Sequence, residues 1–382
     1  MSASDPVVVL GRFPPPIDGQ TLATARTAEL IEAARPVLRV STTADEPGAT
    51  VRSEPRWDWA RVAHYLGLRR AIRRRLADAP GAPVLWASVS PHPLGHARDL
   101  LATRPALDRA HPLAAVVHRG NFGDVFTSPL TRRTAQRMVE RLDAVVFLTE
   151  SLAEACAPFV PEAKRVVIPN TIGGDLIPDL DVVEGARQRR AERQASSAPA
   201  RLLYLGGMIA SKGYGDVLDA AARLRDRGTP AHVRFAGRWA SADDEAAFRQ
   251  RIDALGLVDT VEVLGPVADR DRVGALLLDA DLLVFPTTYP TEAQPLVVLE
   301  AFAAGTPVVV TRHAGLPEMV EDGRQGTFTA PHDADALADA VTRALADWRT
   351  LSEGARARFE AVYGPGAVRR QWLALLDRLE RR

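Results

Sequence analysis

Short runs of β-branched and aliphatic residues alternate along the chain with longer stretches whose apolar residues have helical spacing. The first series of short runs comprises Val7–Leu10, Val84–Ser88, Ala114–His118 and Ala144–Leu148. A second series comprises Arg201–Gly206, His232–Ala236, Val261–Leu264, Leu282–Phe285 and Pro307–Thr311. Uniformly apolar runs of this length are typical of parallel strands that are covered on both faces. Strands that alternate with helices on both sides of a break predict two doubly wound α/β domains.

The break between the two series is a polar stretch without apolar periodicity. Residues 185–200 are rich in Arg, Gln, Ala and Ser, and we predict a linker there. It separates an N-terminal domain, residues 1–184, from a C-terminal domain, residues 201–365. Residues 366–382 predict a last helix that could pack back on the N-terminal domain. A chain of 382 residues is long enough to give both domains cores of their own.

Composition excludes some classes of partner and compartment. The 48 Lys and Arg residues balance 48 Asp and Glu residues, so no overall charge attracts the chain to nucleic acid. The single cysteine, Cys156, cannot form an internal disulfide, and no apolar run approaches the roughly 20 residues that span a bilayer. The first residues show no charged leader of a signal peptide. We therefore expect a cytoplasmic protein.

Two carboxylates follow the apolar run Leu282–Phe285. Glu292 lies in the loop after this run, and Glu300 lies on a helix that is predicted to start near Pro295. The N–H groups at such a helix start, here Leu296 and Val297, favour a phosphate, while a carboxylate on the first turns can accept two ribose hydroxyls. Glu292 could then bind hydroxyls of a transferred sugar, with Gln294 and Pro295 beside the same ligand. The simpler alternative is a helix-capping Glu292 and a solvated Glu300.

A glycine loop and a lysine follow the run Arg201–Gly206. Gly206 and Gly207 would let the backbone approach a phosphate closely. Lys212, further along the same loop, would neutralise a leaving diphosphate without a metal ion. Taken alone, a lysine in such a place is usually a surface residue, and the neighbouring carboxylate pattern is what favours the functional interpretation.

The stretch from Glu292 to Glu300, together with its continuations Glu300–Val309 and Gly315–Glu318, resembles the E-x7-E signature of family-4 retaining glycosyltransferases. The resemblance implies the GT-B fold, in which two Rossmann-like α/β domains face each other across a cleft. It also implies transfer of a sugar from a UDP-, GDP- or ADP-sugar donor to a hydroxyl-bearing acceptor, with no further cofactor and no metal. Lys212 and Glu292 would then belong to the catalytic residues.

The resemblance also places residues of the N-terminal domain at the donor. His118 matches the position where many members direct a histidine toward the donor sugar, and would bind a hydroxyl or steady developing positive charge. The backbone near Gly19 and Gln20 would face the diphosphate. The alternatives are a structural histidine and an ordinary rigid turn.

One position departs from the family pattern. Many relatives carry arginine directly after the first glycine of the second-domain loop, where this chain has Gly207. Arg12, which follows Gly11, and Arg238, which follows Gly237, are candidates to supply the missing phosphate contact.

The acceptor site is the least defined part of the prediction. Trp57 and Trp59 could stack on a sugar, and His92 and Asn121 lie in neighbouring loops of the N-terminal domain. Packing explains both tryptophans equally well. A zinc pair of His92 and His96 is disfavoured because no third ligand has suitable spacing.

Two wider questions stay open at this stage. The segment Arg61–Leu76 predicts a basic amphipathic helix, which some relatives use to touch anionic lipid at the inner membrane face, although a solvated helix face is the simpler interpretation. An NDP-sugar epimerase of the same architecture, or a non-catalytic sugar-nucleotide-binding protein, are the alternatives to a glycosyltransferase. The nucleotide, the sugar, the acceptor and the oligomeric state are not predicted.

Overall fold

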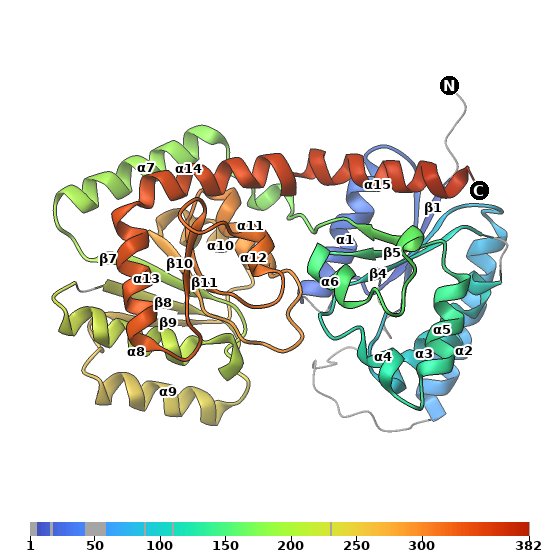
Figure 1. Ribbon diagram of the computed structural model, residues 1–382, viewed down its shortest axis with the longest axis horizontal. Helices are drawn as coiled ribbons and strands as arrows, with labels where there is room; N and C mark the ends of the chain where they lie inside the picture. The colour runs from blue at the N-terminus through green and yellow to red at the C-terminus, as the bar shows by residue number, and fades with distance from the viewer. Residues whose placement is uncertain are drawn as a thin grey trace. The chain divides into compact units, whose positions relative to one another are not determined.

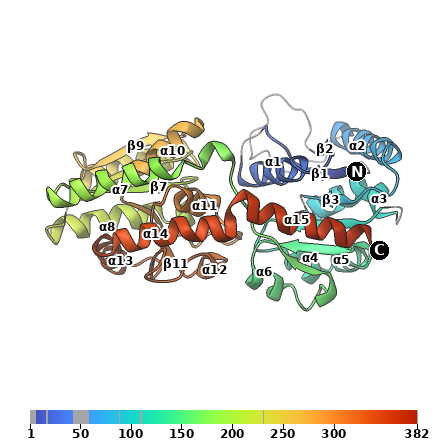
Figure 2. The ribbon, with the colours of Figure 1, turned by 90° about the horizontal axis from the view of Figure 1, so that it is seen from above.

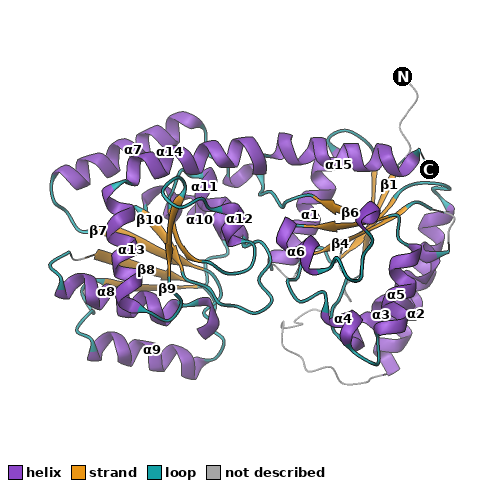
Figure 3. Ribbon diagram, in the orientation of Figure 1, coloured by secondary structure: helices purple, strands orange, loops and turns teal. Residues whose placement is uncertain are grey.

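The computed structural model describes residues 6–15, 18–42, 59–87, 89–108, 111–229 and 231–381. The chain divides into two compact units: residues 1–171 together with 365–382 form unit 1, and residues 172–364 form unit 2. In each unit a parallel sheet lies between helices (Figures 1 and 3). Each unit therefore has the layered α/β architecture that alternating strands and helices predict.

The described part of unit 1 contains a six-stranded sheet in the order β2-β1-β3-β4-β5-β6. Its strands are β1 Val7–Gly11, β2 Val37–Ser41, β3 Val84–Trp86, β4 Leu113–Val117, β5 Ala144–Phe147 and β6 Arg165–Val167. Its α-helices are α1 Gly19–Glu32, α2 Trp59–Ala77, α3 Pro93–Leu107, α4 Asp124–Thr127, α5 Arg132–Arg141, α6 Glu150–Ala155 and α15 Pro365–Glu380. The central strands β1, β3, β4 and β5 are completely buried, which explains their uniformly apolar sequences.

The C-terminal helix α15 is part of unit 1 and lies beside α1 (Figure 2). Its apolar face is buried in one cluster with residues of β1 and α1, and Trp372 is 2% exposed there. An ion pair between Arg35 and Glu380 joins the end of this helix to the turn before β2. The last helix thus completes the core of the unit that contains the N-terminus.

Unit 2 contains, among its described residues, a second six-stranded parallel sheet in the order β12-β11-β10-β7-β8-β9. Its strands are β7 Ala200–Leu205, β8 Ala231–Ala236, β9 Val261–Gly265, β10 Leu282–Phe285, β11 Val308–Thr311 and β12 Gly326–Thr329. Its α-helices are α7 Leu180–Ala195, α8 Tyr214–Asp226, α9 Ala242–Ala254, α10 Arg270–Asp279, α11 Leu296–Ala303, α12 Leu316–Met319, α13 Ala334–Ala346 and α14 Trp348–Arg358. The direction of winding reverses between β7 and β10, and such a switch point is where open α/β sheets bind ligands.

The stretch 185–200, expected as a linker, is mostly the helix α7, which belongs to unit 2. The division between the units falls after residue 171 instead. The inward face of α7 consists of Val183, Ala186, Arg187 and Arg190, at helical spacing. Because two of these four buried positions are arginines, the helix has no apolar periodicity in the sequence.

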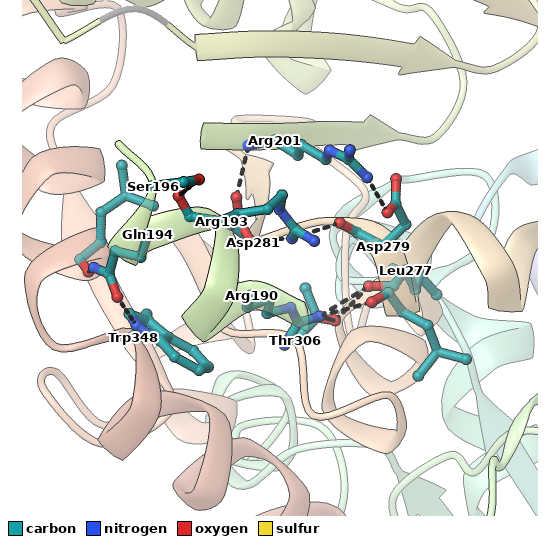
Figure 4. A network of polar contacts seen from close by, with 12 residues as sticks. Arg190, Arg193, Gln194, Ser196, Arg201, Leu277, Asp279, Asp281, Thr306 and Trp348 are labelled. Atoms are coloured by element: carbon teal, nitrogen blue, oxygen red, sulfur yellow. Dashed lines mark hydrogen bonds and ion pairs between the residues drawn. The ribbon is translucent and has the colours of Figure 1, made fainter. Parts of the chain in front are cut away.

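Arg190 is 2% exposed and binds the carboxyl-terminal ends of two helices (Figure 4). It donates from Nη1 to the Gly305 carbonyl oxygen at 3.0 Å, and from Nη2 to the Thr306 hydroxyl at 2.8 Å and the Leu277 carbonyl oxygen at 3.2 Å. Burial lowers the pKa of Arg190 to about 10, so the guanidinium stays charged at neutral pH. A positive charge at helix C-termini is favourable, because the carbonyl ends of helices carry partial negative charge.

In the described part of the chain, no helix combines the length and the apolar character needed to cross a bilayer.

Candidate functional site

The loops after β7 and β10 meet at the switch point of unit 2. The amide of Thr288 donates to the carbonyl oxygen of Ser211 at 2.7 Å, and its hydroxyl donates to the same oxygen at 3.2 Å. Gly213, with φ of 82°, allows this approach, because a Cβ atom there would lie 2.5 Å from the carbonyl oxygen of Pro286. Side chains from the two loops are therefore brought together where a ligand is expected.

Lys212 and Glu292 form an ion pair across these two loops. The Nζ atom of Lys212 lies 3.3 Å from Oε2 of Glu292, and the side chains are 20% and 12% exposed. The ammonium also lies 5.0 Å from the ring centre of Tyr289 and 5.6 Å from that of Phe285. Glu292 Oε2 is buried, and beyond this ion pair it accepts no hydrogen bond from the described residues.

The helix α11 begins four residues after Glu292, with Pro295 as its N-cap residue. Pro295 makes no side-chain hydrogen bond that caps this end, and the first helical N–H groups, including Leu296 and Val297, have no acceptor within the helix. Gln294 is buried in the turn before the helix. An uncapped helix start beside a lysine is suited to an anion such as a phosphate.

Glu300 lies within α11 and is 6% exposed, so it is not the solvated residue of the simpler alternative. Arg270, the first residue of α10, donates from Nη2 to Glu300 Oε1 at 2.6 Å. Arg270 could not be predicted from the sequence, because the two residues are distant in sequence and lie on different helices. A contact of this kind depends on how α10 packs against α11.

The glycine loop after β7 is held by the neighbouring strand β8. The amide of Gly206 donates to the Ala236 carbonyl oxygen at 3.0 Å, and the Tyr204 hydroxyl donates to the Gly207 carbonyl oxygen at 3.0 Å. The Arg238 carbonyl oxygen accepts from the Met208 amide at 2.9 Å, while the Arg238 side chain is exposed. The backbone of Arg238 thus adjoins the glycine loop, and its guanidinium extends into solvent.

In unit 1, Arg12 and Asp18 lie in the loop between β1 and α1. Asp18 caps α1 by accepting from the Thr21 amide at 2.8 Å, and Arg12 Nη2 lies 3.3 Å from its second carboxylate oxygen. Gly19 and Gln20 form the first turn of this helix. Arg12 therefore already has a carboxylate partner inside unit 1.

His118 follows β4, and it lies at the carboxyl-terminal end of the unit 1 sheet, as does the loop after β1. Burial lowers its pKa to about 4, and the carbonyl of Ala87 and the charge of Asp18 oppose this shift only partly. Its Nε2 atom is buried and has no partner among the described residues. A neutral imidazole with an open ring nitrogen can exchange a hydrogen bond with a ligand hydroxyl.

The acceptor candidates are scattered over unit 1. Trp57 lies outside the described residues, and Trp59 begins α2. His92 is exposed at the start of α3, and Asn121 donates from Nδ2 to Asp124 at 3.0 Å. The described residues contain no cluster of three His, Cys, Asp or Glu side chains that could hold a metal ion. The acceptor site stays a prediction.

A family of known proteins matches the larger part of unit 2. Residues 186–360 match the family Glycosyl transferases group 1. The matched segment contains the ion pair of Lys212 and Glu292, the helix α11 and Glu300. The family match therefore covers every donor-site residue predicted for the C-terminal domain.

Longer alignments extend the likeness beyond this segment. Glycogen synthase of Mycobacterium tuberculosis (strain H37Rv) is 29% identical over 367 residues, which cover 93% of this chain and 82% of that protein. D-inositol 3-phosphate glycosyltransferase of Mycolicibacterium paratuberculosis is 32% identical over 256 residues, which cover 65% of this chain and 55% of that protein.

The fold also has solved counterparts. The crystal structure of Anabaena Alr3699/HepE in complex with UDP and glucose matches with a TM-score of 0.71 at 19% identity, covering 98% of this chain and 100% of that one. The fold class expected from the sequence, a GT-B fold with two Rossmann-like α/β domains, is confirmed by the two parallel sheets and by this likeness.

Proposed function

We propose that the protein is a retaining glycosyltransferase of family 4 that moves a sugar from an NDP-sugar donor to a hydroxyl of an acceptor. The observation that carries this proposal is the pairing of Lys212 and Glu292 at the switch point, beside the uncapped start of α11. The glycosyl transferases group 1 segment and the glycosyltransferase names of the relatives support it.

The donor would lie beside the loops that follow β7 and β10 in unit 2. Its diphosphate would bind the first N–H groups of α11, the backbone at Gly206 and Gly207, and the ammonium of Lys212. Its ribose would bind Glu300, which points from the second turn of the same helix. The transferred sugar would bind the Glu292 carboxylate. UDP in the Anabaena structure supports a nucleoside diphosphate as the ligand class.

The chemistry would depend on positioning and on charge rather than on a protein nucleophile. The bond between the anomeric carbon and the diphosphate oxygen breaks, and the acceptor oxygen bonds to the same face of the sugar. The acceptor proton passes to the departing phosphate oxygen, which balances the reaction. Lys212 stabilises the negative charge that develops on the diphosphate, in the role that a divalent cation has in metal-dependent transferases. His118 would bind a sugar hydroxyl as a neutral imidazole.

The first experiment identifies the donor. Thermal unfolding is measured with UDP-, GDP- and ADP-glucose, because a ligand that binds the native state raises the unfolding temperature. Donor turnover is then followed without acceptor as slow hydrolysis, and NMR of products made with candidate acceptors gives the anomeric configuration.

Two variants test the site assignment itself. Lys212→Ala and Glu292→Ala should each lower donor turnover about 100-fold or more, in line with the loss of one group that stabilises transition-state charge. Full activity of both variants would exclude the proposed site. NMR of the NDP-sugar alone separates transfer from epimerisation, and tight NDP binding without any turnover would favour a binding protein.

A further inference from the structure

Side-chain contacts join the helices α10 and α11 at two places. At the donor end, Arg270 Nη2 binds Glu300 Oε1 at 2.6 Å. At the second place, Arg190 binds the Leu277 carbonyl oxygen near the end of α10 (Figure 4). It also binds the Gly305 carbonyl oxygen just after α11. The hydroxyl of Thr306 donates to the same Leu277 oxygen at 2.6 Å. These contacts fix the first residue of α10 relative to the middle of α11.

The Arg270–Glu300 contact has the features of a preorganised ligand-binding group. The Glu300 side chain is 8% exposed, and a buried carboxylate is costly unless a cation or several donors compensate it. Arg270 supplies the positive charge and occupies Oε1, which leaves Oε2 of Glu300 open to a ligand. The Nε atom of Arg270 is buried without a partner among the described residues.

We infer that Arg270 is a positioning residue of the nucleotide site, which holds the Glu300 carboxylate in the orientation that receives the ribose hydroxyls. The inference rests on the proposed function, because it assigns Glu300 to ribose. It differs from a direct role, in which the Arg270 guanidinium would itself contact the nucleotide. A positioning role predicts that Arg270 matters only as long as both Glu300 and a ribose hydroxyl are present.

The test compares two probes, UDP and 2′-deoxy-UDP, by calorimetric titration. If the wild type binds GDP or ADP instead, the corresponding nucleotide and its 2′-deoxy form replace them. The wild type should prefer the ribose form about 10-fold to 100-fold, as expected for a hydrogen bond to a charged group. In Arg270→Met this preference should fall to about threefold or less, and Arg270→Lys should lie between the two. Arg272→Met is the matched control, since Arg272 is an exposed residue of the same helix.

The Glu300→Gln background separates the two roles of Arg270. If Arg270 acts through Glu300, adding Arg270→Met to Glu300→Gln should change UDP affinity less than about twofold. A further tenfold loss in the double variant would show direct contact with the nucleotide and overturn the inference. The double variant also removes the buried unpaired carboxylate, so it stays informative where Arg270→Met alone unfolds.

Failure of the inference is distinguishable from failure of the proposed function. If Glu300→Gln loses the preference for ribose and Arg270→Met and Arg270→Lys both keep it, the positioning role is wrong and the donor site stands. If the wild type binds UDP and 2′-deoxy-UDP equally, Glu300 does not bind the ribose 2′-hydroxyl. The proposed role of Arg270 is then wrong as well.

Discussion

The ammonium of Lys212 lies 3.3 Å from Oε2 of Glu292, although the two residues come from loops that follow different strands of the unit 2 sheet. Both side chains are largely buried, so bulk solvent screens the pair less than it screens a surface ion pair. The chain contains only one other lysine, Lys164, among 48 basic residues. A compact ammonium is therefore retained at position 212 in a sequence that otherwise uses arginine.

This composition makes Lys212 directly observable by chemical labelling. We expect a nucleoside diphosphate to slow acetylation of Lys212 severalfold, because the diphosphate would cover the amine and hold it protonated. Lys164 is the internal control, since its Nζ atom donates to the carbonyl oxygens of Val139 and Glu140 in unit 1. Mass spectrometry of peptides after limited acetylation, with and without UDP, GDP or ADP, gives both rates in one experiment. Equal protection of both lysines, or of neither, would speak against a diphosphate at Lys212.

Gly207 offers a gain-of-binding test. A Cβ atom at this position would meet only Ile209, at 3.6 Å, which is ordinary van der Waals contact. Gly207→Arg should therefore fold normally and place a second cation beside the proposed diphosphate. We expect affinity for the nucleoside diphosphate to rise about threefold to 30-fold, the range of a charge-assisted hydrogen bond that is partly exposed. The measurement is calorimetric titration, with Gly207→Ala as the control for the loss of glycine. Binding by Gly207→Arg that is no tighter than binding by Gly207→Ala would contradict this expectation.

Most strands that the sequence predicted are central and apolar, and β9 is a predicted strand that lies at a sheet edge. The three strands that it missed, β2, β6 and β12, all lie at an edge of a sheet. β2 and β6 have mostly half-buried or exposed residues, and β12 is buried but reads Gly-Thr-Phe-Thr, with one apolar side chain. The apolar run that reveals a central strand is therefore weaker in these three edge strands.

The donor-site candidates that could be predicted lie beyond the ends of single strands. Lys212 and Glu292 lie in the loops after β7 and β10, and Glu300 lies on the helix α11 that follows the second loop, so the parallel topology places all three beyond the carboxyl-terminal ends of strands. Arg270 and Arg190 could not be predicted in the same way. Each meets its partners through packing between helices, and the sequence pattern around an arginine is the same whether its side chain is buried or solvated.

Gly213 provides a test of how closely the two donor loops must approach. Gly213→Ala combines a left-handed φ of 82° with a Cβ atom 2.5 Å from the carbonyl oxygen of Pro286. Gly228→Ala is the matched control, because Gly228 has a φ of 76° and no atom within 4 Å of such a Cβ. Both variants should lose about 1 to 2 kcal/mol of unfolding free energy from backbone strain. Gly213→Ala should lose more than this.

Nucleotide binding should separate the same two variants. Only Gly213→Ala moves the loop of Lys212 away from the loop of Glu292, so only this variant should bind the nucleoside diphosphate more weakly than the wild type. Urea denaturation gives the unfolding free energies, and titration of the folded proteins gives the affinities. Equal affinities in the two variants would mean that the donor site does not depend on the close approach at Gly213.

Two histidines of unit 1, the buried His96 and the half-buried His118, predict how stability depends on pH. Burial lowers the pKa of His118 to about 4 and that of His96 to about 4, below the ordinary value near 6.5. The unfolded chain then binds protons at a higher pH than the native chain. The free energy of unfolding is therefore unaffected by these two histidines above pH 6.5, and it decreases as the pH falls from 6.5 to 4. Each histidine contributes at most about 3 kcal/mol to this loss.

Replacing His118 should therefore flatten the acid side of the stability profile. The free energy of unfolding of His118→Gln should fall less between pH 6.5 and pH 4 than that of the wild type, because one of the two depressed groups is gone. His232→Gln is the control, since the His232 side chain is exposed on β8 and has no burial cost to remove. Urea denaturation at intervals of half a pH unit measures the profile. A His118→Gln profile parallel to that of the wild type would show that His118 accepts a proton as readily in the folded chain as in the unfolded one. That result would remove the argument for a neutral imidazole beside the donor sugar.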